Sequence, residues 1–183
     1  MTNMRFTSLD EFDDVSAHNK ARELARQGMS EAEILAYLNR TGRDNSRTPM
    51  QWDASPYAGF STHQPWLPVN PNYEMINVES QLYDSHSVLN FHREMIRLRK
   101  RETALVYGRY ALLLAAHPQI YAYSRTWQGQ RILVLCNLSG KHALWPEADL
   151  SLRGAISLLA NMEEGEDAYR LRPWEARVYT CHN

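Results

Sequence analysis

The chain has 183 residues, enough for one domain or for a small domain with an appended segment. Hydrophobic residues make up 44% of it, so it can bury a core and does not have the composition of a disordered chain. Its 20 basic and 21 acidic residues give a net charge of -1, so the charge balance does not favour nucleic acid or anionic lipid as a partner.

Targeting signals and cysteines are sparse. No stretch reaches the roughly 18 continuous apolar residues of a transmembrane span, and the first residues lack the apolar centre of a secretory signal. Cys136 lies in an apolar run, far in sequence from Cys181, and we interpret it as a small buried hydrophobe. We therefore expect a reduced, cytoplasmic location and no membrane partner.

Two helices are predicted near the N-terminus. The first spans about Val15–Gln27 and ends at Gly28. The second spans about Glu31–Asn39 and begins with a Ser-x-x-Glu capping box at Ser30. An acidic run precedes them and has two interpretations: paired carboxylates for acid–base chemistry, or residues that cap and solvate a helix. Adjacent positions point in different directions, so we favour the second for Asp10, Glu11, Asp13 and Asp14.

The stretch GRDNSRTPMQWD at 42–53 is dense in groups that can bind a polar ligand. Arg43 and Arg47 lie four residues apart, and Pro49 prevents a helix from running through. One interpretation is the rim of a pocket. The other is a structural loop whose arginines pair with Asp44, Asp53 or carbonyls, and from the residues alone the structural loop ranks first.

From about residue 43 to 82 the periodicity is weak and prolines recur, which predicts a loop far longer than the usual connection of about 4–6 residues. A loop of this length is functional, disordered or a lid. Its aromatic residues argue against disorder because they need burial, and we expect them to pack within the loop: Trp52, Tyr57, Phe60, Trp66 and Tyr73.

A further helix is predicted from Ser85 or Ser87 to Lys100, with Val88, Phe91, Met95 and Leu98 on one face. Basic residues crowd its C-terminal end. They fit either a phosphate site or a solvated helix end where cations complement the dipole, and we favour the helix end for Arg97, Arg99, Lys100 and Arg101.

After Glu102 the pattern changes to β structure. Strands are predicted at 105–114, 119–126, 131–138 and 155–159, with short ones near 169–171 and 175–180. Residues 127–130 are expected to form a hairpin, and the wholly apolar run Ile132–Cys136 a central strand covered on both faces. The pattern indicates an α+β chain that divides near residue 103, with an antiparallel β-sandwich second.

Short motifs follow one another along the whole chain: GRDNSRTPMQWD at 42–53, AGF at 58–60, PW at 65–66, VNPNY at 69–73, VYG at 106–108, NLS at 137–139 and LRPWEA at 171–176. In this order they resemble the α-glucosidase branch of glycoside hydrolase family 13, which includes oligo-1,6-glucosidases, trehalose-6-phosphate hydrolases and sucrose isomerases. The resemblance implies that residues 1–102 are the remnant of the last βα unit of a (β/α)8 barrel and that 103–183 are the C-terminal antiparallel β-sandwich. A whole barrel takes about 250 residues, more than precede the sandwich here.

The resemblance also implies a retaining mechanism in complete members, in which two carboxyl groups lie about 5–5.5 Å apart. The family's catalytic carboxylates belong to motifs on earlier barrel strands, and we find none of these motifs here. The calcium-binding aspartate loop and any zinc spacing of histidines are also missing. We therefore expect no catalytic residue, no metal and no cofactor in this chain.

Substrate contact is what the resemblance leaves to this chain. Arg43 and Arg47 match arginines at the rim of the sugar pocket, where planar guanidinium groups suit hydroxyls and carboxylates. The expected function is the C-terminal part of an α-glucosidase that is inactive alone. The alternative is a stand-alone carbohydrate-binding or accessory protein, including one that complements a separately encoded barrel portion. The expected ligands are small α-glucoside sugars.

One expectation concerns order. The apolar face of the helix ending at Lys100 should lie exposed unless the sandwich or a partner covers it. We expect a cooperative β domain and a poorly ordered first hundred residues.

Overall fold

A computed structural model describes residues 2–163, 165 and 167–182. Internal packing separates two units, Met1–Ser87 and Val88–Asn183, which are described in turn. The assignment of residues 1–102 to the end of a catalytic barrel and of 103–183 to a C-terminal sandwich domain remains a prediction.

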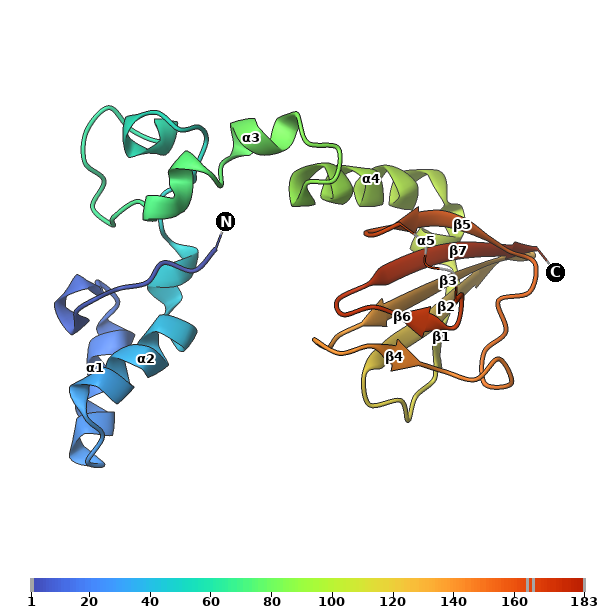
Figure 1. The fold of residues 1–183 in the computed structure, drawn as a ribbon, viewed down its shortest axis with the longest axis horizontal. Coiled ribbons are helices and arrows are strands. Elements are labelled where there is room, and N and C mark those ends of the chain that lie inside the picture. Colours follow the sequence, from blue (N-terminus) through green and yellow to red (C-terminus); the bar gives the residue numbers. More distant parts are fainter. Residues whose placement is uncertain (1, 164, 166, 183) are drawn as a thin grey trace. The chain divides into compact units, whose positions relative to one another are not determined.

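In the first unit, α1 (Val15–Arg26) and α2 (Glu31–Thr41) pack as a helical hairpin (Figure 1). Both predicted helices are confirmed. Asp14 caps α1, and Gly28, with φ 88°, supplies the left-handed conformation that lets the chain turn. Ser30 and Glu33 form the expected capping box of α2. A small core fills the space between the helices and the preceding turn η1 (Leu9–Glu11), made of Phe6, Phe12, Ala17, Leu24, Ile34 and Leu38.

The long segment that follows α2 is mostly irregular, as predicted. It contains the short turns η2 (Arg43–Ser46), η3 (Pro56–Gly59) and η4 (Pro71–Glu74), and a five-residue helix, α3 (Val78–Leu82), that was not predicted. The expected burial of its aromatic residues is wrong for four of them. Buried Ala58 and Leu67 hold the loop together instead, and the side chains that lie exposed are Trp52, Tyr57, Phe60 and Trp66.

The second unit begins with α4 (Val88–Arg101) and α5 (Thr103–Tyr107). A five-stranded antiparallel sheet follows, in the order β1-β2-β3-β7-β5: β1 (Arg109–Leu113), β2 (Ile120–Trp127), β3 (Gln130–Asn137), β7 (Ala176–His182) and β5 (Ala155–Ala160). The hairpin at 127–130 is confirmed, since Gln128 and Gly129 both have positive φ, as its two-residue turn requires. A separate pair is formed by β4 (Ala143–Leu144) and β6 (Arg170–Leu171).

The strand expected over 105–114 is wrong at its start, because residues 103–107 form α5 and β1 begins only at Arg109. Ala104 is fully buried against Ile132 and Val134 of β3, and this packing favours a helical turn over the β propensity of the sequence.

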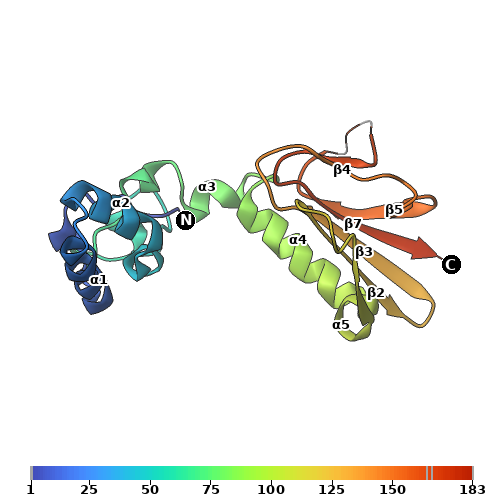
Figure 2. The same ribbon diagram turned by 90° about the horizontal axis from the view of Figure 1, so that it is seen from below.

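The central strand β3 is covered on both faces, as predicted. Leu133 and Leu135 point into the larger core under β4 and β6, whereas Ile132 and Val134 point toward α5. Figures 1 and 2 show α4 on one face of the sheet and the β4–β6 pair on the other. The fold is thus α+β with an antiparallel sheet.

The apolar face of α4 is only partly covered. Leu98 is buried and Phe91 half-buried, whereas Val88 and Met95 are exposed. In the described part of the chain, every helix is too short or too polar to cross a membrane.

Candidate functional site

The loop at 42–53 begins where α2 ends. The Gly42 N–H donates to Leu38 O at 2.6 Å, and a Cβ at this position would come within 2.7 Å of that oxygen and 3.0 Å of the Phe12 ring. A side chain would therefore push the loop away from α1 and α2. Gly42 sets the path that brings both arginines over the start of α1.

Arg43 binds Asp14 in a bidentate pair. Its Nε lies 2.7 Å from Asp14 Oδ2 and its Nη2 lies 2.9 Å from Oδ1, while Nη2 also donates to Ser16 Oγ at 2.6 Å. The Asp14 carboxylate also accepts from the Ser16 N–H at 2.9 Å as the N-cap of α1. The hydrogen bond from Arg43 is the largest of the effects that hold the pKa of Asp14 far below its usual range.

Arg47 is held more loosely. Its Nη1 lies 3.4 Å from Asp44 Oδ1 and its Nη2 4.0 Å from Asp14 Oδ2. Asp44 is fully buried, and its other oxygen accepts from the backbone N–H groups of Asp13 and Asp14 at 2.9 and 3.0 Å. Most of the Arg47 donors therefore have no short hydrogen bond within the described residues.

Both predicted arginines line one hollow of about 580 Å³, which α1 borders on its other side. Their side chains are 62% and 39% exposed, whereas those of Asp14 and Asp44 are 5% and 0% exposed. The arrangement presents guanidinium donors to solvent and keeps the carboxylates beneath them. Sequence reasoning named Arg43 and Arg47 but missed Asp14 as the shared anchor, because nothing local links residues 29 positions apart. Their predicted role in substrate contact remains a prediction.

The rest of the loop is anchored by Gln51, whose Nε2 donates to Asn72 Oδ1 at 2.9 Å and to Ile76 O at 2.7 Å. Three buried oxygens of the segment find no hydrogen-bond partner among the described residues: Asn45 Oδ1, Thr48 Oγ1 and Gln51 Oε1. An unpaired buried acceptor costs free energy that a further donor would recover.

The described carboxyl groups whose pKa is displaced all shift in one direction. Among the described residues, every carboxyl group with a displaced pKa has it lowered, Asp14 most clearly. A general acid of a glycosidase needs a raised pKa. The interpretation of the acidic run as helix-capping is confirmed for Asp14. No group of three metal-ligating side chains lies together within the described residues.

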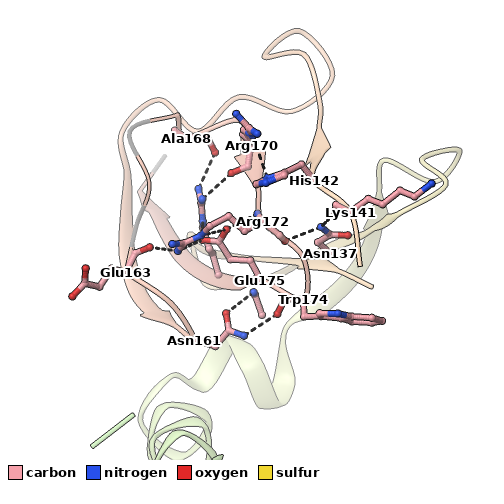
Figure 3. A network of polar contacts seen from close by, with 12 residues as sticks. Asn137, Lys141, His142, Asn161, Glu163, Ala168, Arg170, Arg172, Trp174 and Glu175 are labelled. Atoms are coloured by element: carbon pink, nitrogen blue, oxygen red, sulfur yellow. Dashed lines mark hydrogen bonds and ion pairs between the residues drawn. The ribbon is translucent and has the colours of Figure 1, made fainter. Parts of the chain in front are cut away.

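A second polar cluster lies in the other unit, around the LRPWEA motif (Figure 3). Glu175 and Arg177 are almost wholly buried, and Arg177 Nε donates to Glu175 Oε1 at 2.9 Å. Glu175 Oε2 accepts from the Arg172 N–H at 2.7 Å, and Arg177 Nη2 donates to Arg170 O at 2.8 Å. Burial alone would raise the pKa of Glu175, but the arginine hydrogen bonds outweigh it and the pKa is lowered. Because this cluster ties β6 to β7, its role is structural.

Comparisons with known proteins identify the family of the chain. The family model for the alpha-amylase catalytic domain matches residues 1–108. An oligo-1,6-glucosidase of Halalkalibacterium halodurans is 42% identical over all of this chain and 34% of its own length. The trehalose-6-phosphate hydrolase of Escherichia coli is 41% identical over 96% of this chain and 32% of its own length.

Solved structures give the same result. A trehalose-6-phosphate hydrolase of Bacillus licheniformis superposes with a TM-score of 0.89 at 35% identity, over 100% of this chain and 34% of that one. An isomaltulose synthase of Klebsiella sp. LX3 superposes with a TM-score of 0.86 at 36% identity, over 98% of this chain and 33% of that one. The chain thus spans about a third of the length of the relatives it matches. By sequence and by structure, the chain belongs to the alpha-amylase family, glycoside hydrolase family 13.

Proposed function

We propose that this chain is the C-terminal part of an α-glucosidase-type glycoside hydrolase for short α-linked gluco-oligosaccharides. In this proposal residues 1–102 are the end of a catalytic barrel, 103–183 are a β-sandwich, and the loop at 42–53 borders the sugar pocket. The similar proteins include enzymes named oligo-1,6-glucosidase and trehalose-6-phosphate hydrolase, which supports the substrate class.

The observation that carries the proposal is that Arg43 and Arg47 both line one hollow with exposed side chains, while most of the Arg47 donors have no short hydrogen bond among the described residues. Guanidinium groups bind sugar hydroxyls and neighbouring carboxylates through planar pairs of donors. The unpaired buried oxygens of Asn45, Thr48 and Gln51 support a loop that takes further partners. Of the two arginines, Arg47 has more free donors and contacts the sugar more directly.

By itself, the chain is proposed to lack hydrolytic activity. A retaining glycosidase needs one carboxylate as nucleophile and one protonated carboxyl group as acid. Asp14 and Asp44 lie nearest the arginines, but both are nearly or fully buried and bound to them, which keeps Asp14 ionised.

An activity assay on the isolated chain tests this part. We expect no turnover of an aryl α-glucoside, isomaltose or trehalose 6-phosphate above a blank. Reproducible turnover that Arg47→Ala abolishes and Arg26→Ala, an exposed residue at the end of α1, leaves intact would overturn the claim of inactivity.

The second candidate is a stand-alone carbohydrate-binding or accessory protein. The observation in its favour is Trp66, which is 71% exposed beside Asp10, Glu11 and Asp13 at a hollow of about 420 Å³. An aromatic face with neighbouring carboxylates suits a neutral sugar ring. Calorimetry with maltose and isomaltose tests it: heat lost in Trp66→Ala but kept in Phe60→Ala supports the candidate, and no heat at millimolar sugar rejects it. Co-purification with a separately made barrel portion tests the complementing form of this candidate.

A further inference from the structure

A second hollow, of about 450 Å³, lies within the second unit on the face of the sheet that carries α4. Its floor includes Val134 of β3 and Val178 of β7, and Met95 and Leu98 of α4 form part of its wall. Strand register sets the opposite wall. Tyr110 of β1 pairs with Arg125 of β2, and Tyr121, Tyr123 and Arg125 alternate onto the same face of β2.

Three tyrosines form the aromatic wall of this hollow. The ring of Tyr123 lies 5.4 Å from those of both Tyr110 and Tyr121, measured between centroids. The Tyr110 and Tyr121 hydroxyls lie 3.2 Å apart, within hydrogen-bond distance. A hydroxyl pair that shares one proton keeps a second proton free to donate and lone pairs free to accept. Both side chains are over 40% exposed, so their faces and hydroxyls can reach a ligand.

Two arginines supply the charge. Arg99 of α4 donates from Nη1 to Leu105 O at 2.9 Å, and Arg125 donates from Nη2 to the carbonyls of Leu105 and Val106 at 3.2 and 3.1 Å. Their positive charges also reach Tyr123: burial raises the pKa of that hydroxyl, and Arg125 and Arg99 act in the opposite direction. Both guanidinium groups donate to the same carbonyl oxygen, Leu105 O, and therefore lie close together.

Carboxylates do not neutralise this pair. Arg97 pairs with Glu94, and Arg101 pairs with Glu102 at 2.9 Å. Arg99 and Arg125 form no ion pair with any described residue, and no acid lines the hollow. Arg99 is thus the basic residue at the end of α4 that lines the hollow, and it has no counterion among the described residues.

An apolar floor, tilted aromatic rings, a hydroxyl pair and two unneutralised guanidinium groups together match one ligand chemistry. Sugar rings present C–H faces that pack on aromatic side chains, their hydroxyls suit the tyrosines, and a phosphate monoester suits arginine donors. We infer that the hollow between α4, β1 and β2 binds a phosphorylated sugar. The inference goes beyond the proposed function, because it concerns the second unit and requires no contact from Arg43 or Arg47.

Calorimetry on the full chain with glucose 6-phosphate at low ionic strength tests the inference, with glucose and inorganic phosphate as parallel ligands. We expect glucose 6-phosphate to bind more tightly than either, because only it engages both the rings and the arginines. Arg99→Gln should weaken binding by about tenfold, since it removes a charge-assisted contact from an exposed side chain. Arg97→Gln, on the same helix but paired with Glu94, should change it by less than about twofold.

A second variant tests the aromatic wall. Tyr121→Ala should weaken glucose 6-phosphate binding while leaving inorganic phosphate unaffected, and thermal melting of each variant confirms that it folds. Amide NMR shifts on titration should map to α4, β1 and β2. The inference is overturned by absence of glucose 6-phosphate binding, by equal weakening in Arg97→Gln, by equal affinity for inorganic phosphate, or by shifts confined to the first unit.

Discussion

At the scale of single residues, Asp14 both caps α1 and binds Arg43, two roles that lie far apart in the sequence. Its position in the acidic run that precedes a predicted helix indicates a cap, and the structure confirms it. Its pairing with Arg43 could not be predicted, because Asp44 and Asp53 lie closer in sequence and offer the same carboxylate. Local patterns thus identify the arginines of the site, and only the folded hairpin of α1 and α2 selects their partner.

Acid should weaken the first unit through this pair. The pKa of Asp14 is lowered in the folded chain, so its contribution to stability is complete above its unfolded pKa of about 3.9 and is lost as pH falls through the folded value. Denaturant unfolding between pH 2 and 7 should therefore show a shallower acid loss in Asp14→Asn than in the wild type. Asp10→Asn, which changes an exposed carboxylate of the preceding turn and leaves the Asp14–Arg43 pair intact, is the control variant. Equal acid loss in Asp14→Asn and the wild type would contradict the prediction.

The buried pair in the second unit predicts a different mutational result. Glu175→Gln leaves the guanidinium of Arg177 buried without its counterion, which costs about 3–5 kcal/mol of unfolding free energy. Glu147→Gln removes an exposed partner of Arg153 and should change little. Urea unfolding followed by tryptophan fluorescence measures the unfolding free energy of both variants. A similarly small loss in both would contradict the prediction that Glu175 compensates the buried charge of Arg177.

At the scale of elements, the sequence predicts well where a boundary carries its own chemistry. The capping box at Ser30, the glycine at 28 and the turn at 128–129 each fix an end locally. Prediction from the sequence fails where tertiary packing determines the type of element. Residues 105–107 have strand-forming side chains but become helical because Ala104 is buried against β3, and the two-residue strand β4 is too short to show a period. The equally short β6 lies within the strand predicted near 169–171.

The junction between α5 and β1 should not tolerate a side chain. A Cβ at Gly108 would lie 2.3 Å from Ala104 O and 3.0 Å from Thr126 N, both backbone atoms that cannot rotate away. Gly108→Ala should therefore lower the unfolding free energy by about 1–3 kcal/mol. Gly140→Ala, whose added Cβ would meet only the Trp174 ring at 3.9 Å, is the matched control. Equal melting temperatures for the two variants would refute the clash.

At the scale of the whole molecule, the chain pairs a small helical core with a larger sheet core. Among the described residues, the cluster of the first unit contains six buried apolar side chains and the main cluster under the sheet contains nine, with a further cluster on the other face of the sheet. Less buried apolar area gives less stability. From the sequence, the resemblance predicts the end of one domain followed by another, with a division near residue 103. It could not show that α4 belongs to the same packing unit as the sheet.

Hydrogen exchange should reflect the two cores. Amides of β3 and β7 are expected to be protected most strongly, and those of α1, α2 and the loop at 43–82 to exchange faster by at least about tenfold, since local opening follows local stability. The measurement is exchange monitored by mass spectrometry on the intact chain. Strong protection across residues 30–100 would contradict the expectation of a poorly ordered first hundred residues.

The position of β7 has a consequence for the order of events in folding. This strand lies between β3 and β5, yet it comes last in sequence among the strands that the structure describes. Until residues 176–182 are available, β3 and β5 have no shared neighbour and each leaves backbone groups unpaired. Pairings so distant in sequence form slowly and expose strand edges meanwhile. The strands β3 and β5 can therefore be joined in one sheet only after residues 176–182 have been synthesised. Until then their unpaired edges must be kept from pairing with other chains.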